Sequence, residues 1–130
     1  MTEKVTVEKI TPVFEDHRGE IMDLLDDEIV LHVGMLTSRA DSIRGNHYHK
    51  KAKQFNYIIK GTIELTTWDP TDPNPVPDVA ILRKGDFVSI PAGIVHTMKA
   101  LEDSEFLDLN TESRSNNAYE EDTFRVTLDG

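Results

Sequence analysis

Short runs in which apolar and polar residues alternate follow one another along almost the whole chain, and this pattern most constrains the fold. The runs are rich in β-branched and aromatic residues, which is typical of strands, and turn-forming residues separate them. Many short strands with almost no helix predict an all-β antiparallel sandwich or barrel. The runs predicted to be strands are KVTVEKI (4–10), EIVLHVGML (28–36), QFNYIIKG (54–61), TIELTTW (62–68), VAIL (79–82), DFVSIP (86–91), EFLDLN (105–110) and TFRVTL (123–128).

Two other segments complete the organisation of the chain. The proline-rich stretch at 69–77 predicts a surface loop, because proline lacks the amide hydrogen that a central strand donates. The stretch RSNNAYEED at 114–122 is the one place that suggests a helix. A length of 130 residues allows one hydrophobic core and is too short for two ordinary domains, so we expect a single domain over residues 1–130.

The composition argues against several classes of function. The chain is 38% hydrophobic and 29% charged, as in soluble globular domains, and no apolar run approaches the roughly 18–20 residues that span a bilayer. The N-terminal stretch lacks the apolar segment of a secretory signal, and the absence of cysteine suits a reducing compartment, so we expect a cytoplasmic protein without a membrane partner. A net charge of −10 would repel nucleic acid, whereas a small anion could still bind a local cluster of arginines.

The residues that could carry chemistry gather in RGNHYHKKAKQ at 44–54. In a strand, residues two apart point to the same face, so His47 and His49 project together. Two imidazoles on one face would repel each other if both were protonated, which indicates a shared partner. Gln54 begins the next predicted strand and shares a face there with Asn56. Three roles stay open for the histidines at this point: metal ligands, proton-transfer groups or structural polar residues.

A second stretch, GDFVSIPAGIVH at 85–96, adds a third histidine. Together the two stretches closely resemble the two sequence motifs of the cupin superfamily, over about residues 40–110. The resemblance implies an all-β jelly-roll, or double-stranded β-helix, with the site inside its mouth. It implies a core over about 29–110, with N-terminal strands in 4–25 and a C-terminal segment 111–130 packed on that core. The matching positions are His47, His49, Gly61, Gly85, Pro91, Gly93 and His96.

The cupin resemblance also implies a metal site, with one departure. His47, His49, Gln54 and His96 stand at the ligand positions, but most metal-binding cupins carry glutamate where this chain has Gln54. An amide oxygen can bind a divalent cation without supplying charge, and three imidazoles with an amide would suit zinc, iron, nickel or manganese. The expectation is therefore either no cofactor or one divalent transition metal at the three-histidine site.

A narrower resemblance concerns cupins that act on nucleotide-activated sugars. DHRGEI at 16–21 and RGNHYH at 44–49 resemble segments of the 3,5-epimerases of dTDP-4-keto-6-deoxy sugars, and RGNHYH also resembles the cupin domain of capsular-polysaccharide reductases. The dTDP-sugar 3,4-ketoisomerases share an RGxHxHKKxxQ pattern that residues 44–54 match, glutamine included, and they are understood to work without a metal. The resemblance thus implies a nucleotide-activated sugar as the substrate.

Proton transfer beside a ketone explains why histidines would serve such a reaction. Moving a keto group, or inverting a centre next to it, begins with removal of a proton by a base whose pKa is best near 7. The resemblance assigns this role to His47 and His49, and it assigns pyrophosphate binding to Arg44 and Arg18. Strict strand alternation turns Arg44 away from His47, so its role requires a bulge or a neighbouring subunit. Asn56 is a further candidate substrate-binding residue.

Three functions remain open from the sequence. The first, which we favour, is a metal-free isomerase or epimerase acting on a dTDP-4-keto-6-deoxy-hexose-like substrate. The second is a metal-dependent cupin enzyme, such as a dioxygenase, lyase or isomerase. The third is a non-catalytic cupin that binds a small ligand.

A homodimer is expected, because exposed edge strands usually pair with another subunit. The apolar residues proposed to supply that surface are Phe55, Tyr57, Ile59, Val5, Val7 and Phe14.

Polar residues outside the candidate site are expected to be structural. We expect His17 in a solvated turn, His32 as a hydrogen-bonded histidine within a sheet, and the acidic residues Glu120, Glu121 and Asp122 on a solvent face.

Overall fold

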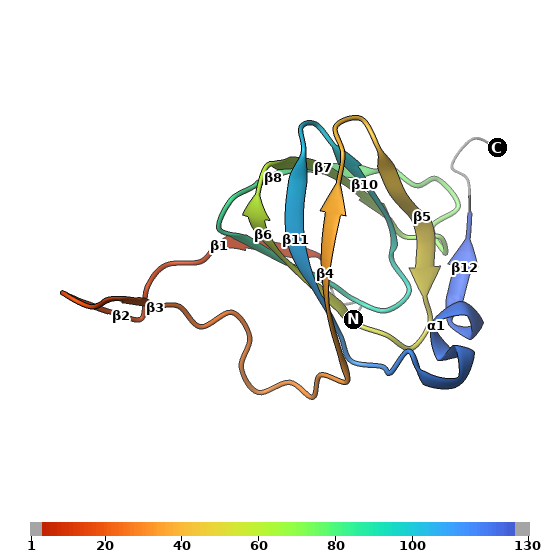
Figure 1. Cartoon of the computed structure of the whole chain (residues 1–130). Coiled ribbons are helices and arrows are strands. Elements are labelled where there is room, and N and C mark those ends of the chain that lie inside the picture. Colours follow the sequence, from red (N-terminus) through yellow and green to blue (C-terminus); the bar gives the residue numbers. More distant parts are fainter. Residues whose placement is uncertain (1–3, 127–130) are drawn as a thin grey trace.

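Two five-stranded antiparallel sheets face each other and form a small barrel (Figure 1). The computed structural model describes residues 4–126. Sheet I has the strand order β1-β9-β6-β11-β4, and sheet II has the order β12-β5-β10-β7-β8. The strands are β1 (Thr6–Lys9), β2 (Phe14–Asp16), β3 (Gly19–Ile21), β4 (His32–Ser38), β5 (Ile43–His49), β6 (Gln54–Lys60), β7 (Thr62–Trp68), β8 (Asp78–Arg83), β9 (Asp86–Ile90), β10 (Val95–Ala100), β11 (Ser104–Asn110) and β12 (Thr123–Arg125); the helical turns are η1 (Ser115–Asn117) and α1 (Ala118–Glu121). The predicted all-β jelly-roll is confirmed.

The hydrophobic core lies between the two sheets. Strands of both sheets contribute side chains that alternate with polar neighbours, as expected for a pleated strand with one buried face. Burial of these side chains away from water stabilises the pairing of the sheets. The buried cluster consists of Ile58, Ile63, Leu65, Leu82, Val88, Ile90, Ile94, Met98 and Phe106.

Strand β6 buries side chains on both faces. Ile58 and Asn56 are fully buried and point into the barrel. On the other face Phe55 is only 2% exposed, and its ring stacks on Phe87 with a centroid distance of 5.9 Å. Because Phe55 is already covered within its own chain, it does not belong to an exposed interface of the kind predicted for it.

The observed strands differ from the predicted runs at several places, and β2, β3 and β5 were not among those runs. Strand β10 was not among those runs, because His96, Thr97 and Lys99 interrupt its apolar pattern; its hydrogen bonds to β5 and β7 on either side make it a strand nonetheless. Strand β4 starts at His32 rather than at position 28. Strand β12 ends at Arg125, and the predicted continuation to 128 lies partly outside the described residues. The proline-rich loop at 69–77 and the short helix within 114–122 are as predicted.

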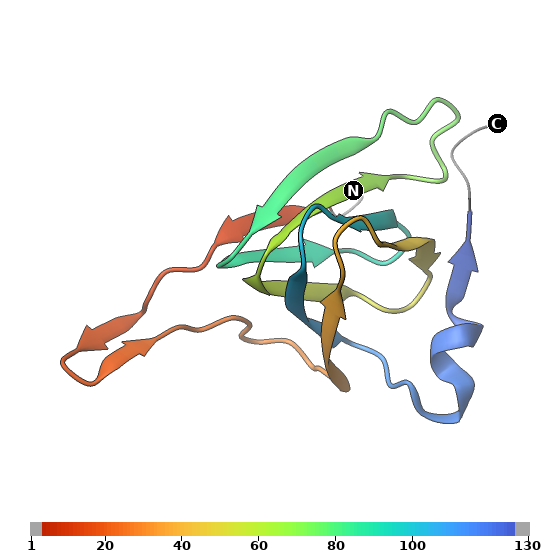
Figure 2. The same ribbon diagram turned by 45° about the horizontal axis from the view of Figure 1, so that its top comes forward.

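The N-terminal strands divide into two groups. Strand β1 pairs with β9 and extends sheet I at its edge, with its own side chains exposed. Strands β2 and β3 instead pair only with each other, and this hairpin projects away from the barrel (Figures 1 and 2). Its apolar side chains Phe14 and Ile21 are 51% and 55% exposed. The expectation that all strands within 4–25 pack on the core is therefore wrong for the hairpin, whose three-residue strands bury too little surface to hold it there.

The C-terminal segment returns to sheet II. After β11 the chain passes through η1 and α1, and β12 then pairs antiparallel with β5. Figure 2 shows this segment beside one end of the barrel, next to β5. Within residues 4–126, no helix has the length and apolar composition that crossing a membrane requires.

The turn between β6 and β7 depends on the absence of a side chain at Gly61. Its φ is +92°, and a Cβ there would lie 2.6 Å from the Asp103 backbone oxygen. We expect Gly61→Ala to lower the free energy of unfolding by more than Gly93→Ala, since Gly93 has a similar φ of +87° but open space around it. The strained φ alone costs about 1–2 kcal/mol, which Gly93→Ala would report. Urea unfolding of both variants measures the difference, and equal losses would contradict a steric role for Gly61.

Candidate active site

Strands β5 and β10 bring three histidines together. They are neighbours in sheet II, and His47 stands directly opposite His96 in their register. The centroid of the His47 ring lies 4.9 Å from that of His49 and 4.7 Å from that of His96. One ring nitrogen of each histidine lies within 4.8 Å of a ring nitrogen of the other two. His49 and His96 are buried, and His47 is partly buried. The predicted three-histidine cluster therefore exists as a physical unit.

A bulge in β5 places Arg44 on the same cavity as His47. The register between β5 and β10 shifts between His96 and Thr97, and Gly45 and Asn46 have φ values of +109° and +58°. An extra residue in one strand reverses the alternation of its side chains. Gly45 is required there, because a Cβ would lie 3.1 Å from the Thr97 Cα in addition to the strained φ.

Backbone carbonyls fix the tautomers of His49 and His96. The Nδ1 of His49 lies 3.0 Å from the Asp122 carbonyl oxygen, and the Nδ1 of His96 lies 3.2 Å from the Ile94 carbonyl oxygen. Since a carbonyl only accepts, each Nδ1 donates its hydrogen and each Nε2 keeps a free lone pair. Both Nε2 atoms are buried without a hydrogen-bond partner among the described residues. Such orphaned acceptors fit either a metal ion or a substrate proton.

The environment keeps His47 and His96 neutral. Burial lowers the pKa of His47 to about 4, and the nearby His49 and Arg125 act in the same direction while Glu120 opposes them. Burial also lowers the pKa of His96 to about 3, with His47 adding to the effect. Both imidazoles are therefore unprotonated at neutral pH and available as bases or as ligands, and their low pKa values make them weaker bases than the value near 7 expected from the sequence.

A cavity of about 370 Å³ opens in front of the histidines. Sheet II contributes His47 and His96, and sheet I contributes Gln54 and Asp108 from the facing wall. Three arginines, namely Arg44, Arg114 and Arg125, line the same cavity. This local concentration of positive charge contrasts with the net charge of −10 on the whole chain.

A larger groove of about 650 Å³ lies elsewhere, along β1, β7 and β8. Its lining is mainly apolar and includes Val5, Val79 and Trp68, and it contains no histidine. We place the chemistry in the smaller cavity, because only there do titratable side chains with shifted pKa values converge.

The C-terminal segment supplies site residues that the sequence did not reveal. The Tyr119 ring lies 5.4 Å from that of His49 and 6.5 Å from that of His47, between centroids. The Arg114 guanidinium lies 4.2 Å above the Tyr119 ring, an arrangement that favours a cation–π contact. No local pattern marks these residues, because the pairing of β12 with β5 alone carries them to the cavity.

Asp122 does not lie on a solvent face, as had been expected. Its carboxylate accepts backbone hydrogen bonds from Lys50 at 2.9 Å, from Lys51 at 3.0 Å and from Ala52 at 3.0 Å. These charge-assisted contacts hold the end of β5, where His49 stands. The expectation does hold for Glu120 and Glu121, which are exposed.

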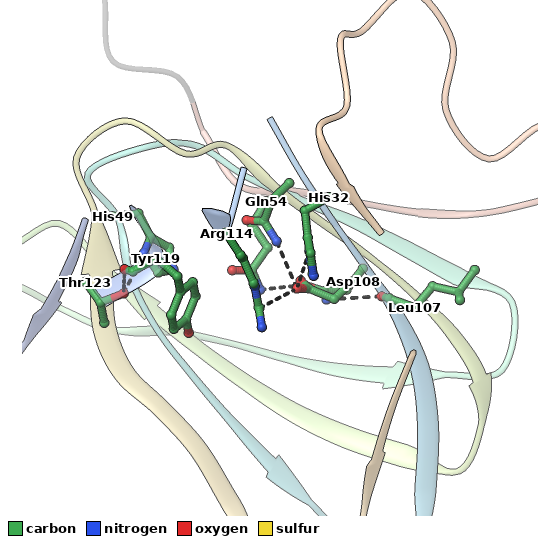
Figure 3. A network of polar contacts seen from close by, with 10 residues as sticks. His32, His49, Gln54, Leu107, Asp108, Arg114, Tyr119 and Thr123 are labelled. Carbon is green, nitrogen blue, oxygen red and sulfur yellow. Dashed lines mark hydrogen bonds and ion pairs between the residues drawn. The ribbon is translucent and has the colours of Figure 1, made fainter. Parts of the chain in front are cut away.

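A polar network crosses the inner face of sheet I and corrects the role of Asn56 (Figure 3). Asn56 is fully buried, and its amide donates to the Asp108 carboxylate at 3.1 Å and to the Leu107 carbonyl at 3.2 Å. Its oxygen accepts from Gln54 Nε2 at 2.8 Å. Asn56 is therefore a structural member of the cavity wall rather than a substrate-binding residue. Gln54 lines the cavity with its amide oriented by this contact.

The remaining candidates lie outside the cavity or beside it. Arg18 stands at the tip of the projecting hairpin, 75% exposed, and pairs with Asp16 at 2.7 Å. It does not line the cavity of its own chain. His32 belongs to sheet I as predicted, but its Nδ1 makes no hydrogen bond to the described residues and lies 3.9 Å from Asp108 Oδ2.

Comparisons with known proteins support the fold and name its relatives. The chain is similar to the dTDP-4-dehydrorhamnose 3,5-epimerase of Sulfolobus tokodaii, at 20% identity and a TM-score of 0.74, over 95% of this chain and 77% of that one. It is similar to a 3,4-ketoisomerase of Helicobacter canadensis, at 17% identity and a TM-score of 0.75, over 96% and 92% of the two chains. It is also similar to ChmJ, a 3′-monoepimerase of Streptomyces bikiniensis, at 15% identity and a TM-score of 0.78, over 95% and 70%. At these identities the likeness concerns the fold.

The sequence itself identifies the family. No curated protein sequence matches the chain significantly. The family model described as "Cupin domain" matches residues 34–109, which is more than half of the chain and includes all three clustered histidines. The chain therefore belongs to the cupin family.

Proposed function

We propose that this chain is an acid–base isomerase or epimerase of a nucleotide-activated keto-sugar. One observation carries the proposal: neutral imidazoles converge on a cavity that also holds three arginines. An unprotonated imidazole can remove a proton beside a ketone at neutral pH, and guanidinium groups are suited to a diphosphate. The similarity to a dTDP-4-dehydrorhamnose 3,5-epimerase and to a 3,4-ketoisomerase supports the same class of substrate. We place the activity in the cytoplasm, in keeping with a sequence free of cysteine.

In this proposal His47 is the base and His49 assists it. His47 is the least buried of the three histidines and lines the cavity, so a bound sugar can approach its ring. His49 lies behind it with a free Nε2 and can stabilise the enediol or relay a proton. Arg44 is held by Ser38 and by the Thr37 carbonyl, at 2.9 Å and 2.8 Å, which orients its guanidinium for the diphosphate.

Proton exchange tests this function directly. In D₂O the protein should introduce deuterium next to the ketone of a dTDP-4-keto-6-deoxy-hexose, as followed by NMR. We expect His47→Asn to slow this exchange by about 10²–10⁴-fold, the usual contribution of a general base. Asn74→Ala is the control, because Asn74 is exposed in the proline-rich loop and does not line the cavity, and it should exchange at the wild-type rate. An absence of exchange with every nucleotide sugar tried would instead favour a cupin that only binds its ligand.

A metal-dependent cupin enzyme is the second candidate, and the orphaned Nε2 atoms favour it. His47, His49 and His96 lie close enough to hold one divalent transition metal, with Gln54 on the same cavity as a further oxygen donor. A bound metal would supply a Lewis acid to polarise the ketone or an enediolate oxygen. The protein would still provide the arginines that hold the substrate.

Metal content and activity after chelation distinguish the two candidates. We expect protein dialysed against a chelator to keep its deuterium exchange, because the proposed bases are the imidazoles themselves. Elemental analysis before and after dialysis reports any zinc, iron, nickel or manganese, with His96→Asn as the variant that should lose it and Asn74→Ala as the control. If exchange disappears with the metal and returns when the metal is restored, the second candidate replaces the first.

We also infer a homodimer formed over the outer face of β4 and the hairpin. Strand β4 is an edge of sheet I and leaves Val33 and Met35 63% and 59% exposed, an apolar surface that a second copy would cover. The projecting hairpin could then carry Arg18 to the cavity of the neighbouring chain. This arrangement would give Arg18 the substrate-binding role that its own chain does not allow.

Light scattering of the purified protein should give twice the monomer mass of 14.7 kDa. We expect Met35→Glu to shift the protein toward the monomer, because a buried, unpaired carboxylate opposes association. Val76→Glu is the control, since Val76 is 83% exposed in the loop that joins β7 and β8 of sheet II, whereas β4 belongs to sheet I. A monomer mass for the wild type at all concentrations would contradict the dimer.

A further inference from the structure

A carboxyl group faces the histidines from the opposite wall of the cavity. Asp108 stands in the middle of β11, in sheet I, whereas His47 and His96 stand in sheet II. All three line the same cavity, and Asp108 is the only carboxylic acid among the described residues that do so. A ligand in this cavity therefore lies between imidazoles on one side and a carboxyl group on the other.

The carboxyl group of Asp108 is held in a fixed position (Figure 3). Its Oδ1 accepts a hydrogen bond from Asn56 Nδ2 at 3.1 Å, and its Oδ2 accepts from Asn110 Nδ2 at 2.8 Å and from Arg114 Nη2 at 3.2 Å. The donors come from β6, from β11 and from the segment before η1, so three parts of the chain orient it. Oδ1 has a single partner within residues 4–126 and can accept or donate one further hydrogen bond.

The surroundings of Asp108 favour its protonated form more than water does. The residue is 4% exposed, and burial raises the pKa of its carboxyl group. Arg114 opposes this effect and is the cation in contact with the carboxylate, while His32 faces it at 3.9 Å from β4. The side chain of Arg114 is 42% exposed, so water screens its charge. Its lowering effect on the pKa of Asp108 is therefore weakened.

We propose that Asp108 is a second proton-transfer group, which delivers a proton to the face of the sugar opposite the histidines. This inference rests on the proposed function, and it specifies the outcome of the reaction. A proton removed by His47 from one face and replaced by Asp108 on the other inverts the configuration of that carbon. Asp108 thereby makes the protein an epimerase rather than a catalyst that returns the proton to the face it left.

The proposed step balances without an oxidant or a reductant. The His47 imidazole takes the proton, the C–H bond breaks, and its electron pair forms the carbon–carbon double bond of an enolate. The enolate carbon then takes the proton of the Asp108 carboxyl group on the opposite face, and the ketone re-forms. The imidazolium returns its proton to water at the open mouth, and the carboxylate regains one from water, so that no net proton is consumed.

Stereochemistry and exchange together test the role of Asp108. In D₂O with a dTDP-4-keto-6-deoxy-hexose, the wild type should give deuterium at the reacting carbon and the inverted product. Asp108→Asn keeps the shape of the side chain but carries no acidic proton. We expect this variant to retain exchange without inversion within about threefold of the wild-type exchange rate, and to lose at least about 100-fold in the rate of inversion. Glu105→Gln, on the same strand but on its other face, should match the wild type in both measurements.

The possible outcomes separate the failure of this inference from the failure of the proposed function. If wild-type protein gives no exchange, both are wrong. If wild-type protein exchanges and Asp108→Asn inverts as fast as wild type, only the assignment of Asp108 is wrong. If a folded Asp108→Asn loses exchange and inversion alike, Asp108 positions the site rather than delivering the proton, and the assignment again fails.

A second variant covers the case in which Asp108→Asn does not fold. Arg114→Gln leaves the carboxyl group in place and removes the neighbouring cation, so the pKa of Asp108 should rise. The pH at which inversion is lost on the alkaline side should then move upward, while His32 remains as the other titratable group facing Asp108. An unchanged pH profile of inversion in Arg114→Gln would overturn the assignment.

Discussion

The pairing of β5 with β10 is the interaction on which the site depends. Antiparallel register puts His47 across from His96, and the two-residue periodicity of β5 adds His49 to the same face. The bulge at Gly45 and Asn46 then turns Arg44 toward the cavity that the histidines occupy. A regular ladder without the bulge would keep the histidines together and send the arginine to the outside. His47 and Arg44 therefore share one wall because of one irregularity in one strand pair.

The sequence contained enough information for the histidine cluster but not for its surroundings. Strand alternation predicted that His47 and His49 share a face, and the resemblance to the two cupin motifs added His96 to the same site. The clamp of Asp122 on Lys50 is different, since it joins residues 72 positions apart. Nothing near position 122 distinguishes that carboxylate from its exposed neighbours. Such contacts follow from the closed fold and cannot be predicted from local pattern.

The same limit explains the contrast between Asn56 and Asp108. Asn56 was a reasonable substrate-binding candidate, since it shares a face with Gln54. In the structure its amide is already hydrogen-bonded to Gln54 and Asp108. The sequence does not mark Asp108 as a site residue, because a carboxylate within the run EFLDLN is the ordinary polar member of an alternating strand. Only the orientation of sheet I decides that this particular face is the inside. Alternation along a strand predicts which residues share a face, and tertiary packing decides which of the two faces points into the barrel.

Charge distribution in the molecule is uneven in a way that suits a small anion. The chain carries 24 acidic and 14 basic side chains, but three arginines meet at the cavity and each is held by a neighbour. Anchored guanidinium groups lose little conformational entropy when a ligand binds. The acidic remainder of the surface would repel polyanions such as nucleic acids, while the compact diphosphate of the proposed substrate would meet the three arginines of the cavity. Net charge and local charge thus act on different classes of ligand.

The late position of β12 in the chain has a consequence for how the protein is made. The carbonyl that fixes the tautomer of His49 belongs to Asp122, and the strand that covers β5 follows directly. On the ribosome, β5 emerges more than 70 residues before the segment that completes its environment. The barrel can assemble around its apolar core first, as the sheets become available. The environment of His49 is completed only when the segment beyond α1 has left the exit tunnel and β12 can pair with β5.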